Sequence, residues 1–409
     1  MFQQPKLLTT LRGYDAPQLQ ADLLAGVTVA MVAIPLSLAI AIASGATPAQ
    51  GLVTAVIAGF LISALGGSRV QIGGPTGAFI VVVAGVIAAH GIDGLVAATF
   101  IAGLLLVLAG LLRAGRLMAL VPEAVVNGFT IGIAAVIATS QLKDLFGLQV
   151  PHEPADVLEK VPALWDARHT LQPAALFVGL ATAALIVLQR RLAPRLPGLI
   201  LAIVLGSALA ALFPAVTTLG DRFGELPSAL PAPRLPDLSR VVELLPAALV
   251  IAFLAGVESL LSAAVADRLI RGNFRPDAEL VAQGVANLGS ALFGGLPATG
   301  AIARTATNVR AGGRTPVAGM VHAVIVLLVM LFAAPLASHL AMPALAALLI
   351  VTAWNMSEPH KWRGYAREGR AALLLLVLTM GLTLLVDLTV AIIVGVALGL
   401  VLRRLGHRT

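Results

Sequence analysis

The sequence predicts an all-α polytopic membrane protein with 14 transmembrane segments, arranged as a 7+7 inverted repeat. Three observations predict this class: the composition, a series of long apolar segments, and a motif that recurs in the second half. Of the 409 residues, 59% are hydrophobic and only 11% are charged, whereas soluble domains carry roughly 25% charged residues. Because lipid-facing surfaces stay apolar, a membrane protein accounts for this deficit and a soluble core does not.

The composition also excludes several classes of protein. The chain has no cysteine, which excludes disulfides, zinc–thiolate sites and cysteine nucleophiles. Its 7 histidines form no HExxH motif or paired metal spacing, so we expect neither a metal enzyme nor a bound cofactor. No signal peptide is predicted, because residues 3–20 are polar and the first apolar run is too long for one.

Apolar runs recur along the whole chain, with glycine and proline inside them as in membrane helices. Several runs are shorter than the ~20 residues that a straight span needs, and the two shortest are 75–89 and 298–311. The last two, separated by Asp387, form either a hairpin or one kinked helix. The fourteen segments are 22–44, 49–66, 75–89, 93–113, 122–140, 172–190, 197–214, 244–267, 276–293, 298–311, 317–338, 341–356, 371–386 and 388–404.

Positive charge is distributed unevenly between alternate loops. With a cytoplasmic N-terminus, most arginines and lysines fall on the cytoplasmic side, as the positive-inside rule requires. The opposite side has only Lys143, Lys160, Arg168, Arg222, Arg234 and Arg240. We therefore expect both termini in the cytoplasm, an inner-membrane location, and a net charge of +7 that reflects topology rather than nucleic-acid binding.

A glycine–proline motif occurs twice, opening the third segment at residues 73–78 and the tenth at 294–301. An offset of 223 residues separates Thr76 from Thr299, and the same offset relates both ends of segment 22–44 to the eighth segment. Seven segments in each half make the halves inverted, which is typical of transporters whose binding site lies where the halves meet. The alternative is a chance recurrence in a chain rich in glycine and proline.

Two short, interrupted segments at matching positions indicate a binding site. A helix that begins inside the membrane presents unpaired N–H groups and partial positive charge, and both favour an anion. Pro75 and Pro297 suit helix starts, and Thr76 and Thr299 can cap the helix or donate a hydroxyl to a ligand. The helix starts also include Gly77, Ala78, Gly300 and Ala301. The residues before them, 70–72 and 291–293, are predicted to form short strands.

Arg304 lies one turn into the tenth segment, and its counterpart at the repeat offset is Val81. Charge inside a bilayer is costly and is usually functional, so one interpretation is a counter-charge for a bound anion. The alternative is an arginine at a helix end that extends to the cytoplasmic surface.

Glu258 lies deep inside the eighth apolar segment, with Ser262 one turn further along the same face. A carboxylate there can carry a proton, so we interpret both residues as a coupling-ion site for H⁺ or Na⁺. The alternative is a structural acid paired with Arg304 or with backbone.

Three stretches resemble the sulfate permease (SulP) anion transporters, the relatives of pendrin and prestin. Residues 22–39 resemble the first helix of that family, 73–78 the third segment, and 301–319 the tenth segment with its exit. The resemblance covers nearly the whole chain and identifies it as a membrane domain of bacterial type. Family members usually continue into a cytoplasmic STAS domain, so we expect either a truncated chain or a natural membrane domain alone.

The resemblance implies a fold shared with nucleobase symporters, with a core domain that moves against a gate domain, and a homodimer in the lipid bilayer. The implied parts are a cytoplasmic N-terminus, 1–21, core halves at 22–113 and 244–338, and gate halves at 122–214 and 341–404.

The resemblance also implies which residues line the pocket. They are Leu36, Ile40, Thr76, Ala303 and Arg304, with Glu258 and Ser262 at the position of the coupling ion. Many members have Gln and an aromatic residue where this chain has Leu36 and Ile40, so we expect a less polar pocket.

The sequence therefore predicts a transporter and not an enzyme. Its expected activity is secondary active transport of a carboxylate, dicarboxylate, bicarbonate or sulfate, by proton-coupled symport with elevator-type alternating access. The alternatives are a passive anion channel or exchanger, a sodium-coupled bicarbonate symporter, and a nucleobase symporter on the same fold. Arg304 favours an anion over a nucleobase, and the lack of an oxygen-ligand cluster around Glu258 favours H⁺ over Na⁺.

Overall fold

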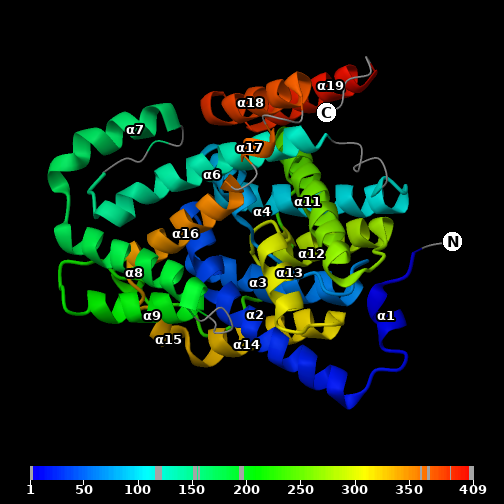
Figure 1. The fold of residues 1–409 in the computed structure, drawn as a ribbon, viewed down its shortest axis with the longest axis horizontal. Helices are drawn as coiled ribbons and strands as arrows, with labels where there is room; N and C mark the ends of the chain where they lie inside the picture. The colour runs from blue at the N-terminus through cyan, green and yellow to red at the C-terminus, as the bar shows by residue number, and fades with distance from the viewer. Residues whose placement is uncertain are drawn as a thin grey trace. The chain divides into compact units, whose positions relative to one another are not determined.

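The computed structural model describes residues 3–115, 122–150, 154, 157–192, 198–359, 362–365, 369–386 and 388–404 (Figure 1). Within them, six helical stretches are long and apolar enough to cross a membrane, and four shorter apolar helices accompany them. The protein is therefore a helical, multi-pass membrane protein. The six are α2 (Ala16–Ala43), α3 (Pro48–Leu65), Gly77–Leu111, α6 (Glu123–Phe146), α8 (Pro173–Leu192) and α11 (Val241–Ile270).

The chain divides into two compact units. The first comprises residues 1–119, 186–204 and 218–340, and the second comprises 120–185, 205–217 and 341–409. Helices α8 and α9 (Gly198–Ala210) each contribute to both units. All the residues that the sequence analysis assigned to a binding site lie in the first unit.

The first unit contains most of the long helices. Helix α4 packs against α11 and α12, and α14 packs against α2 and α3. Small residues allow close packing, since a side chain at Gly103 of α4 would meet the Gly284 carbonyl of α12 at 2.9 Å. Its further elements are α1 (Lys6–Thr10), β1 (Gly73–Gly74), η1 (Gly77–Phe79), α4 (Ile80–Leu111), α10 (Leu219–Phe223), α12 (Pro276–Leu292), β2 (Thr299–Gly300), α13 (Ile302–Arg310), α14 (Pro316–Phe332) and α15 (Ala334–Ala337).

Local sequence explains where these helices begin and bend. Proline occupies the first turn of α3, α12 and α14, where its missing N–H costs nothing. The Asp15 side chain caps α2 by accepting from the Gln18 amide at 2.8 Å. Inside α4, Gly91 has φ 72° and ψ −179°, a conformation that glycine adopts without strain. Gly91 therefore separates the helices predicted at 75–89 and 93–113.

One two-stranded sheet occurs in the described part of the first unit. Strands β1 and β2 pair antiparallel, with Gly73 opposite Gly300 and Gly74 opposite Thr299. The prediction of strands at 70–72 and 291–293 is wrong, because residues 70–72 precede β1 and Ala291–Leu292 complete α12. The pairing forms at glycines because Gly73 lies directly against Ile62 of α3, where a side chain would collide.

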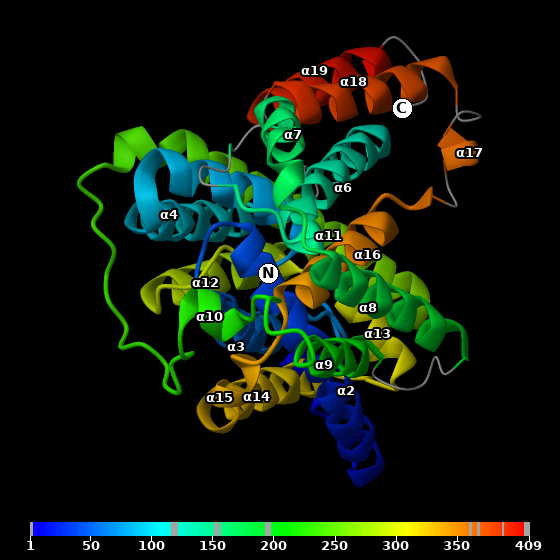
Figure 2. The ribbon, with the colours of Figure 1, turned by 90° about the vertical axis from the view of Figure 1, so that its left-hand side faces the viewer.

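The second unit is built around α6, which packs against α16 (Met342–Met356) and α18 (Arg370–Leu385). Helix α18 also packs against α19 (Leu388–Arg404), and both views show the two helices alongside one another (Figures 1 and 2). The tail is therefore a hairpin and not one long helix, and Asp387 itself lies outside the described residues. The unit also contains α7 (Val157–Asp166), η2 (Ala167–Thr170) and α17 (Trp362–Tyr365).

Candidate functional site

The pairing of β1 with β2 brings two helix starts together from distant parts of the chain. Because the strands are antiparallel, the chain leaves them in opposite directions, toward η1 and α4 on one side and toward α13 on the other. The Ala301 amide donates to the Ile72 carbonyl at 2.8 Å and extends the pairing by one bond. The first-turn N–H groups of a helix lack partners inside that helix. This arrangement therefore gathers donors and partial positive charge at the ends of one strand pair.

Both threonines of the repeated motif bond to α11. The Thr76 hydroxyl donates to Oε2 of Glu258 at 3.0 Å. The Thr299 hydroxyl donates to the Ala255 carbonyl at 2.9 Å, one turn earlier on the same helix. Thr299 is fully buried and Thr76 is 6% exposed. The strand pair is thus attached to α11 at two adjacent points, one of them an ionisable side chain.

Arg304 is buried inside the first unit, with 1% of its surface exposed. Its Nη2 donates to the Pro75 carbonyl, and Nη1 lies close to Gly74, where any side chain would collide with it. Among the residues that the structure describes, Nε and Nη1 find no hydrogen-bond partner. This burial is incompatible with the alternative in which Arg304 extends to the cytoplasmic surface. A buried guanidinium with two unused donor nitrogens favours a further acceptor, and the oxygens of a small anion would match its geometry.

Glu258 is partly buried, and its carboxylate interacts electrostatically with the Arg304 guanidinium. One turn further along α11, the fully buried Ser262 hydroxyl lies 3.4 Å from that of Thr305, on α13. Thr305 in turn accepts a hydrogen bond from the Ile72 amide at 3.0 Å. Glu258 and Ser262 therefore face the elements that carry Thr76 and Arg304.

The structure places the remaining predicted residues around the same strand pair. Leu36 and Ile40 are 8% and 2% exposed on α2, which packs against α13. Gly77 and Ala78 open η1, Gly300 lies in β2 and Ala301 precedes α13. Ala303, by contrast, is exposed on α13.

The sequence analysis singled out Glu258 inside the eighth apolar segment, and it missed Glu279. Glu279 is fully buried on α12, and its carboxylate accepts five hydrogen bonds. A signal for it was present in the sequence. Glu279, Gln283, Asn287 and Ser290 follow helical spacing and form a polar stripe, which in a membrane helix must face protein.

Asp22 is a second buried acid with a structural role. It lies on α2 with no exposed surface. Its Oδ1 accepts from the amides of Arg314 and Thr315 at 2.8 and 3.2 Å, and its Oδ2 accepts from the Thr315 hydroxyl at 2.5 Å and from the Tyr14 hydroxyl at 3.0 Å. Burial and the neighbouring Asp22 charge raise the pKa of Tyr14 to about 12. Asp22 thereby joins α2 to the start of α14.

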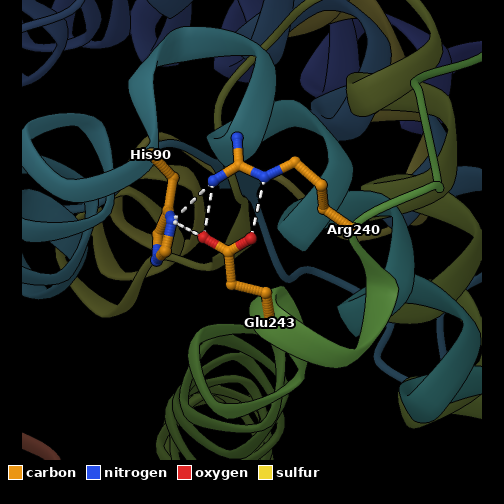
Figure 3. Close-up of polar contacts among 3 residues, drawn as sticks. All are labelled: His90, Arg240 and Glu243. Carbon is orange, nitrogen blue, oxygen red and sulfur yellow. Dashed lines mark hydrogen bonds and ion pairs between the residues drawn. The ribbon is translucent and has the colours of Figure 1, made fainter.

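A separate polar cluster connects the kink of α4 to the start of α11 (Figure 3). Arg240 donates from Nε and Nη2 to the two carboxylate oxygens of Glu243, at 2.9 and 2.6 Å. Nδ1 of His90, next to the Gly91 kink, lies 3.1 Å from Oε1 of Glu243. These contacts attach the start of α11 to the kink of α4, and all three side chains are solvent-accessible.

Comparisons with a family model and with known proteins all find similarity to anion transporters. The model of the sulfate permease family matches residues 19–379. The putative sulfate transporter YvdB of Bacillus subtilis is 42% identical over 404 residues, covering 97% of this chain and 76% of the relative. The bicarbonate transporter BicA of a Picosynechococcus strain is 32% identical over 397 residues, covering 92% and 69% of the two chains.

Solved structures resemble the fold as well. The transmembrane domain of a cyanobacterial bicarbonate transporter BicA superposes with a TM-score of 0.82 at 32% identity, covering 92% of this chain and 98% of that one. Murine Solute Carrier 26 family member A9, an anion transporter in the inward-facing state, gives a TM-score of 0.90 at 18% identity. That second comparison covers 98% of this chain and 71% of the other, and it supports the fold alone.

Proposed function

The chain belongs to the sulfate permease family, and we propose that it is a secondary active transporter whose anion binds between the starts of η1 and α13. The observation that carries this proposal is Arg304, a buried guanidinium with two unused donors beside the strand pair. In a site of low dielectric constant, fixed donors stabilise an anion more strongly than they do in water. The two helix starts add partial positive charge without a further side chain.

We propose that Glu258 couples anion movement to protons. Its carboxylate interacts with Arg304 and accepts from Thr76, so its charge opposes an anion that would also bind Arg304. A proton on Glu258 removes that opposition, so proton and anion bind together. The same proton changes the Thr76 contact, whereas the contact of Thr299 with the α11 backbone is unaffected. Ser262 belongs to this ion site because it faces Thr305.

The wider architecture is part of the proposal. Two inverted halves of seven segments form a core at 22–113 with 244–338 and a gate at 122–214 with 341–404, and the core moves as an elevator. The protein acts as a homodimer in the inner membrane with both termini in the cytoplasm. The pattern that supports the inversion is the recurrence of a glycine-rich strand followed by a helix at β1 and β2.

The substrate is a small anion of the carboxylate, dicarboxylate, bicarbonate or sulfate class. The relatives' names differ between sulfate and bicarbonate. Leu36 and Ile40 are nearly buried beside α13, so the site offers little polar surface beyond the helix starts and Arg304. We therefore expect a singly charged, partly apolar anion to compete well with sulfate, since the desolvation of sulfate costs more.

Uptake into proteoliposomes tests the proposal. Labelled sulfate, bicarbonate, chloride, acetate and succinate are each supplied with an inward proton gradient, with a sodium gradient, and with neither. We expect one anion to accumulate against its gradient with protons. Glu258→Gln should abolish that accumulation while preserving anion exchange, and Glu225→Gln, at an exposed glutamate, is the matched control.

Other results of the uptake experiment would indicate one of the alternative functions. Accumulation of bicarbonate driven by sodium indicates a sodium-coupled bicarbonate symporter; the similarity to the bicarbonate transporter BicA supports bicarbonate as a substrate to include in the panel. Uptake that only equilibrates under every gradient indicates a channel or exchanger and contradicts the coupling role of Glu258. If no anion of the panel enters, the anion-transport proposal fails.

A further inference from the structure

Glu279 lies outside the site described above, but its carboxylate bonds to the elements that form that site. It is fully buried near the start of α12. Oε1 accepts three hydrogen bonds of 2.8–3.1 Å, and Oε2 accepts two more of 2.9 and 3.2 Å. The five donors are Gln283 Nε2, Ser259 Oγ and Gln71 Nε2 on Oε1, with the amides of Gly67 and Ser68 on Oε2.

Two of the three side-chain partners of this carboxylate, Gln71 and Ser259, flank the site directly. Gln71 lies two residues before β1, and its amide packs against Gly300 of β2, where any side chain would collide with it. Ser259 follows Glu258 on α11 and also accepts from Gln71 Nε2 at 2.8 Å. Through Gln71 and Ser259, this carboxylate is therefore linked to the segment before β1, to β2 and to α11.

The other end of the polar stripe on α12 holds the approach to β2. Asn287 donates to the Ala298 carbonyl and accepts from the Ala298 amide, both at 2.9 Å. Ser290 donates to the Leu296 carbonyl at 2.7 Å. One helix thus holds the segment before β1 through Glu279 and the segment before β2 through Asn287, and groups held by a helix are placed more accurately than groups on loops.

We propose that Glu279 is a positioning residue for anion binding. It does not contact the anion. It fixes the distance between the two helix starts and the orientation of the α11 turn that carries Glu258, and so sets the affinity for the anion. This inference rests on the proposed function, because affinity is read from transport, and its test therefore includes a measurement that needs no transported substrate.

Glutamine at position 279 is a sensitive probe because every partner of the carboxylate is a donor. A carboxamide of the same shape replaces one acceptor oxygen with an NH₂ group. With the NH₂ at the Oε2 position, it faces the Gly67 and Ser68 amides, which can only donate. With the NH₂ at the Oε1 position, the side chains of Gln71, Gln283 and Ser259 must reorient to accept instead of donating. The same change at Glu258 is milder, because its bonded partner is the Thr76 hydroxyl, which can donate or accept.

The experiment compares Glu279→Gln with Glu225→Gln in two measurements. Anion uptake gives KM and the maximal rate, and hydrogen–deuterium exchange reports the protection of residues 67–73 and 299–305. We expect Glu279→Gln to raise KM by about tenfold and to speed exchange in both segments, since bonds to a charged group are strong. Glu225→Gln should match wild type. Wild-type KM with wild-type exchange in both segments would overturn the inference.

A double variant separates positioning from general stabilisation. Gln71→Glu with Glu279→Gln restores an acceptor facing a donor between the two positions, so we expect KM and exchange to return toward wild type. A lower Tm in Glu279→Gln with unchanged KM, or no recovery in the double variant, would contradict the positioning role.

Gln71→Leu covers the case in which Glu279→Gln does not fold. It removes the donor that bridges Glu279 and Ser259 and leaves the carboxylate four other bonds. We expect a raised KM and faster exchange at 299–305, and wild-type values of both contradict the inference. If wild type moves no anion at all, the proposed function fails, and the exchange data still decide whether Glu279 orders both strands.

Discussion

The two strand-and-helix elements share a sequence motif but make different contacts. On the β1 side, Thr76 bonds to a side chain that can change its charge. The counterpart of Arg304 on this side is Val81, which carries no charge. On the β2 side, Thr299 is fully buried and bonds to a backbone carbonyl of α11. Arg304 extends from α13 across to the Pro75 carbonyl next to β1.

Two elements with the same sequence motif can therefore form a site that is not symmetric. Each half supplies a helix start and a threonine, and one half adds the cation. The β2 side is fixed to α11 whatever the protonation state, whereas the contact of the β1 side depends on Glu258. A change at Thr299 should therefore affect stability, and a change at Thr76 should affect coupling.

The largest expected effect comes from Arg304. Arg304→Ala removes the buried cation and leaves the nearby Glu258 charge uncompensated, so the KM for the anion should rise about 30-fold or more. Arg304→Lys keeps the charge but lacks the planar fork of donors, and an intermediate KM is expected. Arg310→Ala, at an exposed arginine on the same helix, is the control in the uptake assay. Equal KM values for Arg304→Ala and wild type would remove the guanidinium from the site.

Variants of the two threonines test whether the β1 and β2 sides have different roles. Thr76→Val should raise KM by about fivefold and shift the pH dependence of uptake, because it removes the donor to Glu258. Thr299→Val should lower the free energy of unfolding by about 1 kcal/mol with the pH dependence intact, because it removes one bond to backbone. Thermal unfolding in detergent and pH profiles of uptake give both readouts. The reverse pattern, with the pH dependence changed only in Thr299→Val, refutes the assignment of roles.

The smallest expected effect lies away from both strands, at Tyr14. Its pKa of about 12 in the folded protein exceeds the ordinary value of 10. The bond to Asp22 therefore stabilises the fold fully below pH 10, and this contribution is lost as pH rises from 10 through 12. Tyr14→Phe should lower the free energy of unfolding by about 0.5 kcal/mol at pH 8, after allowance for solvent screening.

The Tyr14 measurement is Tm against pH in both proteins. The difference in Tm between wild type and Tyr14→Phe should shrink above pH 10, while the KM for the anion stays equal at pH 8. A constant difference across that range would show that ionisation of Tyr14 is not the cause.

Much of the site could be predicted, because its signals are local. The glycine–proline motifs locate both helix starts, and Arg304 and Glu258 stand out as charges in apolar segments. Glu279 was missed because an acid in the first turn of a helix is favourable in water and is common there. Its burial depends on Gln71 and Ser259, which are distant in sequence. The strands were misplaced because Ala291–Leu292 read as extended residues before a helix, whereas they complete α12.

The amino-acid sequence alone predicts a membrane protein of many helices, with breaks at glycine and proline and two similar half-segments. These properties follow from composition and from interactions within a few residues. The folded structure was needed to show that Gly74 lies opposite Thr299, that Thr76 bonds to a carboxylate 182 residues away, and that Arg304 is buried. The physical reason is that register and burial depend on how α11, α12 and α13 pack around the strands. That packing sums many weak contacts between residues far apart in the chain, and no local pattern encodes it.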